Sequence, residues 1–318
     1  MGVPQGSVLG PILFLICINE LCKKGGTSDY ISSFADDTVI LFWSNSWEQL
    51  NQTANHVLKD EINPWFLKNL LTLNKDKTVC VPFSTSSIEF DPRYVPIKLI
   101  IHEALCSNTN CNRRFERKLS RYLGILLHYK LSWKSHIDHV CAKLKRAVAT
   151  ITNLKRFLSR DSLKVIYLAL FQPHLTYGLC CFGNSAKGDL LKLEKLQRFA
   201  IKSILNLPRS YPTNEICPMM GVFPLKVLYK LELVKIMITF LPCIFINNSK
   251  YKLRNSLAVV PRHRLDISKT GTLLNTINLF NSLPPINRDV LCFHHLHPNP
   301  LLNYVKDQIA KWLVSINV

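Results

Sequence analysis

The sequence has few acidic residues. Its 318 residues include 21 Asp and Glu against 40 Lys and Arg, which gives a formal net charge of +19 at pH 7. A positive excess of this size attracts polyanions, and nucleic acid is the commonest of them. A solvated basic face without a specific partner is the alternative interpretation. The charge balance favours nucleic acid as the partner.

A disulfide framework, a signal peptide and a membrane span are lacking as well. The 11 cysteines are odd in number, and several lie in apolar runs, which is typical of buried thiols in a reducing compartment. The apolar run 8–17 has no basic segment before it and no small-residue cleavage site after it. The run 236–246 is shorter than the roughly 20 residues that a span needs, and Pro242 interrupts it. We therefore expect an intracellular protein, cytoplasmic or nuclear, that is neither secreted nor inserted in a membrane.

The composition is that of a globular protein, with 47% hydrophobic residues. The predicted secondary structure changes near Leu131. Short β-prone runs and helical runs alternate before this point, and long amphipathic helical patterns follow it. The predicted helices of the later part are 137–158, 162–182, 190–205, 225–240 and 301–314. The sequence therefore predicts an α+β fold first and an all-α part second.

The earlier part has a more varied pattern. Residues 8–21 predict a buried helix, and residues 46–71 predict a helix that Pro64 kinks or splits. Two β-prone runs, 30–35 and 38–43, flank Asp36-Asp37 and predict a hairpin with the acidic pair in its turn. Further strands are predicted at 78–83, 97–101 and 119–127.

The acidic pair is the most informative element of the hairpin. Two neighbouring carboxylates repel each other, and apolar strands on both sides hold them together. A divalent cation compensates such an arrangement, and Mg²⁺ prefers hard carboxylate oxygens. An ordinary Asp-Asp turn is the alternative, because Asp is a common turn former.

Four elements in order decide between these interpretations. Gly2-Val3-Pro4-Gln5-Gly6-Ser7 precedes a helix, and Phe34-Ala35-Asp36-Asp37 follows it. Leu73-Asn74-Lys75-Asp76-Lys77-Thr78 and Tyr122-Leu123-Gly124-Ile125 come next. Together they resemble the palm motifs of reverse transcriptases from non-LTR (LINE-type) retrotransposons, close to jockey-like and CR1-like elements. Group II intron maturases share parts of this pattern.

The resemblance continues into the helical part. Trp133, His136 and Ile137 stand where these enzymes have a Trp-x-x-His-Ile start to the thumb helix. Residues 172–178 resemble a Pro-x-Leu-x-Tyr-Gly segment, 190–208 resemble a Leu-x-x-Leu-Gln-x-x-Ala helix, and 279–284 resemble Leu-Trp-Asn-x-Leu-Pro. The resemblance implies a carboxy-terminal fragment of such an enzyme. It would comprise a partial palm at 1–130, a helical thumb-like domain at 131–246 and a partly irregular C-terminal region at 247–318.

The family joins a nucleotide to a primer 3′-hydroxyl by two-metal phosphoryl transfer. The resemblance implies that Asp36 and Asp37 are the catalytic residues and Mg²⁺ ligands, with Asp37 in the weaker role. It places Gln5, Gly6, Ser7 and Lys77 in the nucleotide and template pocket. For two of these residues the alternatives are that Ser7 caps the next helix and that Lys77 is a solvated lysine.

The resemblance also implies an RNA template and a DNA primer, or an RNA–DNA hybrid, as partners. Tyr122, Leu123 and Gly124 would form the primer grip. The predicted nucleic-acid-binding surface consists of basic residues on the first thumb helix, which are Lys143, Lys145, Arg146, Lys155 and Arg156.

One departure from the family concerns the metal site. The family carries a further metal-binding aspartate and the fingers before the Gly-Val-Pro-Gln-Gly loop, which here begins at Gly2. We therefore expect the chain alone to have exposed apolar surface, poor expression and no polymerase activity. A non-catalytic, basic nucleic-acid-binding fragment is the alternative function. Residues 102–111 and 292–297 contain Cys and His, but their spacing does not favour zinc.

Overall fold

The computed structural model describes residues 6–24, 26, 29–74, 77–83, 118–245 and 271–283. The chain divides into two compact units, residues 1–120 and 121–318. The described residues form a mainly helical fold with two small antiparallel sheets, as expected of an α+β protein. The predicted strand 97–101, the predicted helix 301–314 and both Cys/His segments lie outside the described residues.

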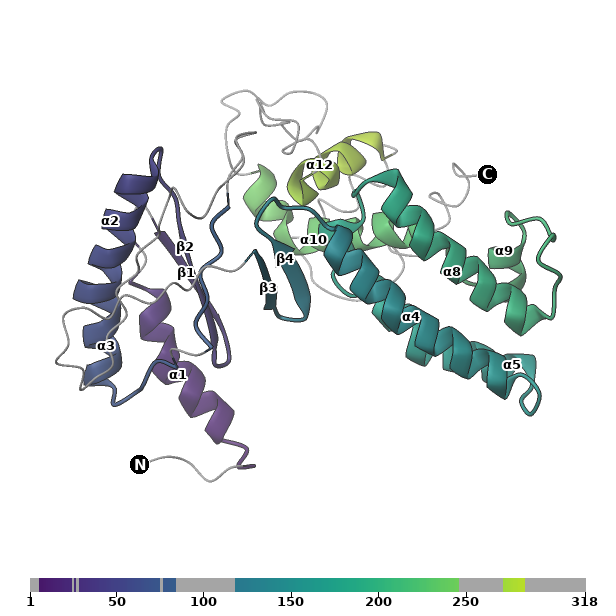
Figure 1. Cartoon of the computed structure of the whole chain (residues 1–318), viewed down its shortest axis with the longest axis horizontal. Coiled ribbons are helices and arrows are strands. Elements are labelled where there is room, and N and C mark those ends of the chain that lie inside the picture. Colours follow the sequence, from purple (N-terminus) through teal and green to yellow (C-terminus); the bar gives the residue numbers. More distant parts are fainter. Residues whose placement is uncertain are drawn as a thin grey trace. The chain divides into compact units, whose positions relative to one another are not determined.

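The first unit is a hairpin with helices packed on it (Figure 1). Its elements are α1 (Gly10–Cys22), β1 (Asp29–Phe34), β2 (Asp37–Phe42), α2 (Trp47–Val57), the π-helical turn η1 (Leu58–Ile62) and α3 (Asn63–Lys68). Helix α1 packs on β1 and α2 packs on β2. Their shared core contains Leu21, Ile31, Ile62 and Trp65.

The predicted hairpin is confirmed, but its turn is shifted by one residue. Asp37 already pairs with Phe34 as the first residue of β2, so only Ala35 and Asp36 form the turn. Ala35 takes a φ of +51°. A positive φ in a two-residue loop matches the right-handed twist of the strands, which explains why so tight a turn closes here.

The prediction of a buried helix is only partly right. Helix α1 forms, but Ile12, Leu13, Leu15 and Ile16 are about half exposed or more. The helix is apolar on all sides, so its sequence does not indicate which face makes contact, and only the side toward β1 is covered. The expected exposure of apolar surface is confirmed for this helix.

Two prolines reshape the helices in the same way. Pro64 follows η1 in the second position of α3, and Pro173 follows the π-helical turn η2 (Tyr167–Phe171) in the second position of α6. Proline has no N–H for the carbonyl four residues earlier, and its ring would clash with that carbonyl. A wider π-turn relieves this conflict, and the break predicted at Pro64 is confirmed in this form.

Two predicted strands are wrong. Residues 78–83 make only a single bridge at Cys80. Residues 119–127 form a second hairpin, β3 (Leu119–Tyr122) and β4 (Ile125–His128), because Leu123 and Gly124 turn the chain.

The second unit is a helical assembly around one large apolar cluster. Its helices are α4 (Lys134–Leu154), α5 (Arg160–Ile166), α6 (Gln172–Thr176), α7 (Leu179–Phe182), α8 (Lys187–Leu205), α9 (Ile216–Met220), α10 (Leu225–Phe245) and α12 (Thr272–Ser282). The patterns at 137–158, 190–205 and 225–240 are confirmed as helices. Residues 162–182 are broken by η2 and by Gly178, and α9 and α12 were not predicted.

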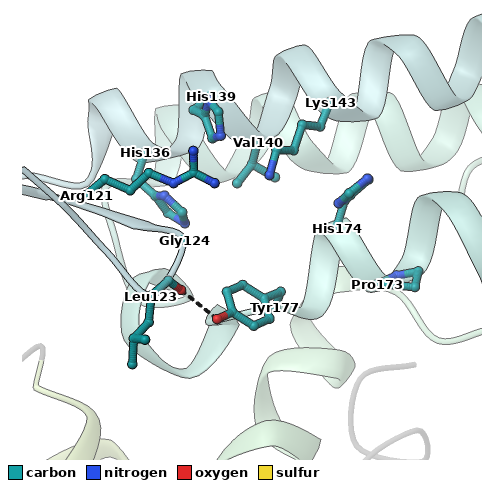
Figure 2. Close-up of a pocket in the computed structure, with 10 residues that line it drawn as sticks. All are labelled: Arg121, Leu123, Gly124, His136, His139, Val140, Lys143, Pro173, His174 and Tyr177. Carbon is teal, nitrogen blue, oxygen red and sulfur yellow. Dashed lines mark hydrogen bonds between the residues drawn. The ribbon is translucent and has the colours of Figure 1, made fainter. Parts of the chain in front are cut away.

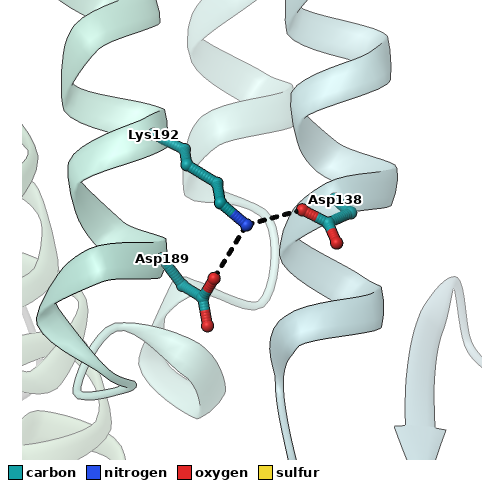
Figure 3. A network of polar contacts seen from close by, with 3 residues as sticks. All are labelled: Asp138, Asp189 and Lys192. Atoms are coloured by element: carbon teal, nitrogen blue, oxygen red, sulfur yellow. Dashed lines mark hydrogen bonds and ion pairs between the residues drawn. The ribbon is translucent and has the colours of Figure 1, made fainter.

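Helices α4 and α8 run side by side (Figure 1) and share the largest helix–helix contact of the unit. Lys192 of α8 lies between two carboxylates, Asp138 of α4 and Asp189 of its own helix, at 2.9 Å from each (Figure 3). Its hydrogen bonds to Asp189 and Asp138 raise the pKa of Lys192. The ion pair therefore connects the two helices at the surface.

A membrane-spanning helix is not found in the part of the chain that the structure describes, since every helix there is too short or too polar.

Candidate functional site

A pocket of about 380 Å³ lies in the second unit between the β3–β4 turn, α4 and α6 (Figure 2). Three separate segments of the sequence meet in it, at residues 121–124, 136–143 and 173–177. Each contains one of the motifs noted in the sequence. The lining residues are Arg121, Leu123, Gly124, His136, His139, Val140, Lys143, Pro173, His174 and Tyr177.

The β3–β4 turn is held against α6 by an interlocking contact. Leu123 and Gly124 both have positive φ, +44° and +81°, as a two-residue hairpin turn requires. The Tyr177 hydroxyl donates a hydrogen bond of 2.6 Å to the carbonyl oxygen of Leu123. A Cβ on Gly124 would lie 3.3 Å from the Tyr177 ring, and one on Gly178 would lie 2.9 Å from Ile125. Each glycine therefore leaves space for a side chain of the other segment.

His136 is the most buried polar group of the pocket, with 2% of its surface exposed. Its Nδ1 accepts a hydrogen bond of 3.3 Å from the Leu126 N–H. Burial, followed by the nearby His139 and Lys143, lowers the pKa of His136 to about 4. The ring is therefore neutral at pH 7, and its proton is on Nε2 because Nδ1 acts as the acceptor.

The remaining polar groups of the pocket are basic. Arg121, His139, Lys143 and His174 point toward a common space in Figure 2. Burial contributes most to lowering the pKa of His139, and Lys143 and Arg121 lower it further. No carboxylate is present among the described residues that line this pocket. The arrangement favours an anionic ligand.

The sequence did not identify most of this site. His136 and Tyr177 belong to recognised motifs, but neither was assigned a binding role. Arg121, His139 and His174 carried no signal of their own. A basic or histidine residue lies inside or beside each motif, and this was the signal in the sequence that could have indicated the site. The motifs are far apart in the chain, and only the fold brings them together.

The predicted nucleic-acid-binding residues do not form one surface. Lys143 lines the pocket, and Arg146 is near enough to lower the pKa of His139. Lys145 instead acts on Cys141 together with Asp138 and Lys192, on the α8 side of the helix. Lys155 and Arg156 are exposed beyond the end of α4. At a rise of about 1.5 Å per residue, they lie roughly 18 Å from Lys143 along the helix.

Of the predicted primer grip, Leu123 and Gly124 line the pocket, whereas Tyr122 ends β3 and is not part of the lining. Leu123 contributes its backbone carbonyl to the bond with Tyr177.

The acidic hairpin belongs to the first unit. Asp36 and Asp37 are both exposed, Asp36 in the turn and Asp37 at the start of β2. Their oxygens suit Mg²⁺ chemically. No group of three or more potential metal ligands occurs among the described residues, so these two carboxylates do not make a complete site there.

The predicted nucleotide-pocket residues are described in part. Gln5 lies outside the described residues. Gly6 has a φ of +88°. The Ser7 hydroxyl accepts a hydrogen bond of 3.1 Å from the Gly10 N–H, which matches the helix-capping alternative. Lys77 is exposed, and its N–H donates to the Asn74 side chain.

Comparison with known proteins shows a family similarity for the first part of the chain. Residues 1–127 match the family described as "Reverse transcriptase (RNA-dependent DNA polymerase)". The match includes the acidic hairpin and the Tyr-Leu-Gly turn. No solved structure matches the chain significantly.

Similar curated proteins come from mobile elements of insects. The RNA-directed DNA polymerase from the mobile element jockey of Drosophila melanogaster is 27% identical over 68% of this chain and 23% of its own length. A probable RNA-directed DNA polymerase from transposon BS of the same species is 24% identical over 65% of this chain and 22% of its own length. The Pol polyprotein from the type-1 retrotransposable element R1 of Nasonia vitripennis is 22% identical over 70% of this chain and 65% of its own length.

The chain thus spans less than a quarter of the jockey and BS relatives. The predicted resemblance to non-LTR elements of the jockey type is confirmed at this level. Residues 1–127 are similar to the reverse transcriptase domain family, and the chain is similar to RNA-directed DNA polymerases of non-LTR retrotransposons.

Proposed function

We propose that this chain is part of an RNA-directed DNA polymerase and that its second unit holds the RNA template and DNA primer. The observation that carries the proposal is the meeting of three family-like motifs in one basic pocket, and the match of residues 1–127 to the reverse transcriptase family supports it. The net charge of +19 supports a polyanionic partner. This partner places the protein inside the cell, in the cytoplasm or nucleus.

We assign the first unit to the palm and the α4–α10 helices to the thumb of such an enzyme. The order of elements supports this assignment, because the acidic hairpin and the Tyr-Leu-Gly turn precede the helices as they do in the family. The domain limits 1–130, 131–246 and 247–318 and the fragment character belong to the same proposal. The boundary between the two compact units, after residue 120, falls within β3.

In this proposal Asp36 and Asp37 contribute to the catalytic metal site, and Gln5, Gly6, Ser7 and Lys77 line the nucleotide pocket. Two exposed carboxylates on one hairpin cannot bind two metal ions by themselves. The proposal therefore requires a further ligand from outside the described residues. Nucleic-acid binding by the second unit does not depend on this ligand.

The test is a binding titration of the purified chain with a fluorescent RNA–DNA hybrid, followed by anisotropy at several salt concentrations. We expect binding that weakens steeply as salt is added, because phosphate contacts release counterions. We also expect the hybrid to bind more tightly than duplex DNA of the same sequence.

Two results would contradict the proposal. Absence of binding at low salt, or an affinity that does not change with salt, would exclude the second unit as a nucleic-acid-binding module. Equal affinity for hybrid and duplex DNA would favour the non-catalytic, basic fragment, which the family match does not favour.

A further inference from the structure

Among the described residues, the pocket of the second unit contains two buried histidine nitrogens without a hydrogen-bond partner. The Leu126 N–H donates a hydrogen bond to Nδ1 of His136, so the neutral ring carries its proton on Nε2 and presents it as a donor. This Nε2 is buried and has no hydrogen-bond partner in the described part of the chain, and the same holds for Nε2 of His139. An unpaired buried polar group costs about 1–3 kcal/mol. A ligand that only accepts hydrogen bonds would remove this cost.

The charges point to the same ligand. Neither Arg121 nor Lys143 forms an ion pair with any described residue. Asp138, an acidic residue of the same helix, is bound by Lys192 on the α8 side. In the part of the chain that the structure describes, Arg121 and Lys143 therefore line the pocket without an acidic partner, and burial, together with Lys143 and Arg121, lowers the pKa of His139. A dianion matches this count better than a monoanion.

The shape limits the size of the ligand. The volume of about 380 Å³ is at the small end of ligand sites, which range from about 300 to 1,000 Å³. The apolar residues of the lining are Leu123, Val140 and Pro173, and the ring of Tyr177 lies across from the basic side chains of Arg121 and Lys143. Figure 2 shows the Tyr177 ring below the basic side chains, so an apolar ring or sugar can pack there while an anionic group meets the cations. The pocket has room for one nucleotide.

We propose that this pocket binds a terminal phosphate, that is, a phosphomonoester on a nucleotide or at the end of a nucleic-acid strand. A phosphomonoester carries about −1.5 to −2 charges at pH 7. An internal phosphodiester carries one. The choice of a nucleotide as the carrier rests on the proposed function, whereas the choice of a dianionic phosphate rests on the lining residues alone.

The experiment compares one fluorescent single-stranded oligonucleotide with a 5′-phosphate, with a 3′-phosphate, or with hydroxyls at both ends. We expect one phosphorylated form to bind the full chain about tenfold more tightly than the hydroxyl form, which corresponds to about 1.4 kcal/mol. The hydroxyl form measures general nucleic-acid binding, so the proposed function and the pocket are tested separately.

Variants locate the preference in the pocket. Arg121→Gln and Lys143→Gln should bring the ratio of the two affinities close to one. The control is Lys226→Gln, which removes an exposed lysine of α10 outside the pocket and should leave the ratio unchanged. Unfolding midpoints of the variants show whether they are folded. Equal affinity for all three oligonucleotides, or a preference that persists in both pocket variants, would overturn the proposal.

A direct measurement does not need the variants to fold. In the ¹⁵N-histidine-labelled chain, inorganic phosphate should shift the Nε2 resonance of His136, and no shift at saturating phosphate would contradict the proposal. Competition against the phosphorylated oligonucleotide then identifies the source of the phosphate. A nucleoside monophosphate that competes as well as a strand end indicates a free nucleotide, and a much weaker competitor indicates the strand end.

Discussion

The Tyr177 hydroxyl and the carbonyl oxygen of Leu123 are joined by a 2.6 Å hydrogen bond across 54 residues of sequence. This bond fixes the β3–β4 turn on α6 and shapes one wall of the basic pocket. Tyr177 and Leu123 belong to two different family-like motifs, so the hydrogen bond shows that these two motifs contact each other in the fold.

Tyr177→Phe should loosen the turn while keeping the aromatic wall. Loss of one neutral hydrogen bond costs about 0.5–1.5 kcal/mol in free energy of unfolding. Urea denaturation measures this change, and amide hydrogen exchange at Gly124 should accelerate. The matched control is Tyr122→Phe on the same hairpin, because the Tyr122 hydroxyl has no hydrogen-bond partner among the described residues. Equal effects of the two substitutions would argue against the role of the Tyr177 bond.

Gly178→Ala should destabilise the second unit. Gly178 has a φ of +70°, and a Cβ there would lie 2.9 Å from Ile125 of β4. The left-handed conformation alone costs an L-residue about 1–2 kcal/mol. Gly188→Ala is the control, since its Cβ would meet nothing within 4 Å in helix α8 and alanine favours a helix by up to about 1 kcal/mol. Thermal unfolding should therefore move in opposite directions for the two variants.

Gln197→Leu should cost about 2–4 kcal/mol, because it leaves several buried groups unpaired. The Gln197 side chain donates to the Tyr167 hydroxyl and the Phe223 carbonyl, and it accepts from the Leu225 N–H at the start of α10. Chemical denaturation is the measurement. Lys195→Leu, at an exposed position of the same helix, should change the free energy of unfolding by less than about 0.5 kcal/mol.

The stability of the chain should fall as the pH is lowered from about 6.5 to about 4, partly because of His136. In the unfolded chain His136 takes up a proton near its ordinary pKa of 6.5, but in the folded chain it stays neutral down to about 4. The unfolded state therefore binds more protons in this window, and the free energy of unfolding decreases by up to about 1.4 kcal/mol per pH unit for one such group. Burial opposes the protonation of His136 most, and His139 and Lys143 oppose it further. Arg121 and His174 line the same pocket.

Urea denaturation between pH 7 and pH 4.5 tests this expectation. His136→Gln should show a smaller loss of stability over this range than the unsubstituted chain, because the other titrating groups are common to both. An identical pH dependence in the two proteins would show that His136 does not contribute.

The chain alone should give no magnesium-dependent primer extension. Among the described residues Asp36 and Asp37 have no third metal ligand near them. The assay uses the purified chain with a primed RNA template and Mg²⁺. Extension that disappears in Asp36→Asn would contradict this prediction and would place the missing ligand in a part of the chain outside the described residues.

Local signals in the sequence determined a large part of the fold. Apolar periodicity located α4, α8 and α10, and Pro64 located the break between α2 and α3. Both effects act within a few residues along the chain, so they survive without tertiary contacts. The same applies to the β1–β2 hairpin, whose turn lies only one residue earlier than predicted.

The remaining features depended on contacts between distant segments. Residues 119–127 have the β-propensity of one strand, but the tolerance of Gly124 for positive φ and the bond from Tyr177 fold them into a hairpin. Helix α9, of five residues, is too short to show a period.

The sequence by itself indicated the similarity to reverse transcriptases, through the order and composition of its motifs, and the positive net charge of the chain. Only the tertiary structure decided which basic and histidine side chains lie together, because Arg121, His136, Lys143 and His174 meet across more than 50 residues of chain. It also separated Lys145, Lys155 and Arg156 from them. The physical reason is that a helix turns successive residues to different sides, so neighbours in sequence diverge while distant residues converge on one pocket.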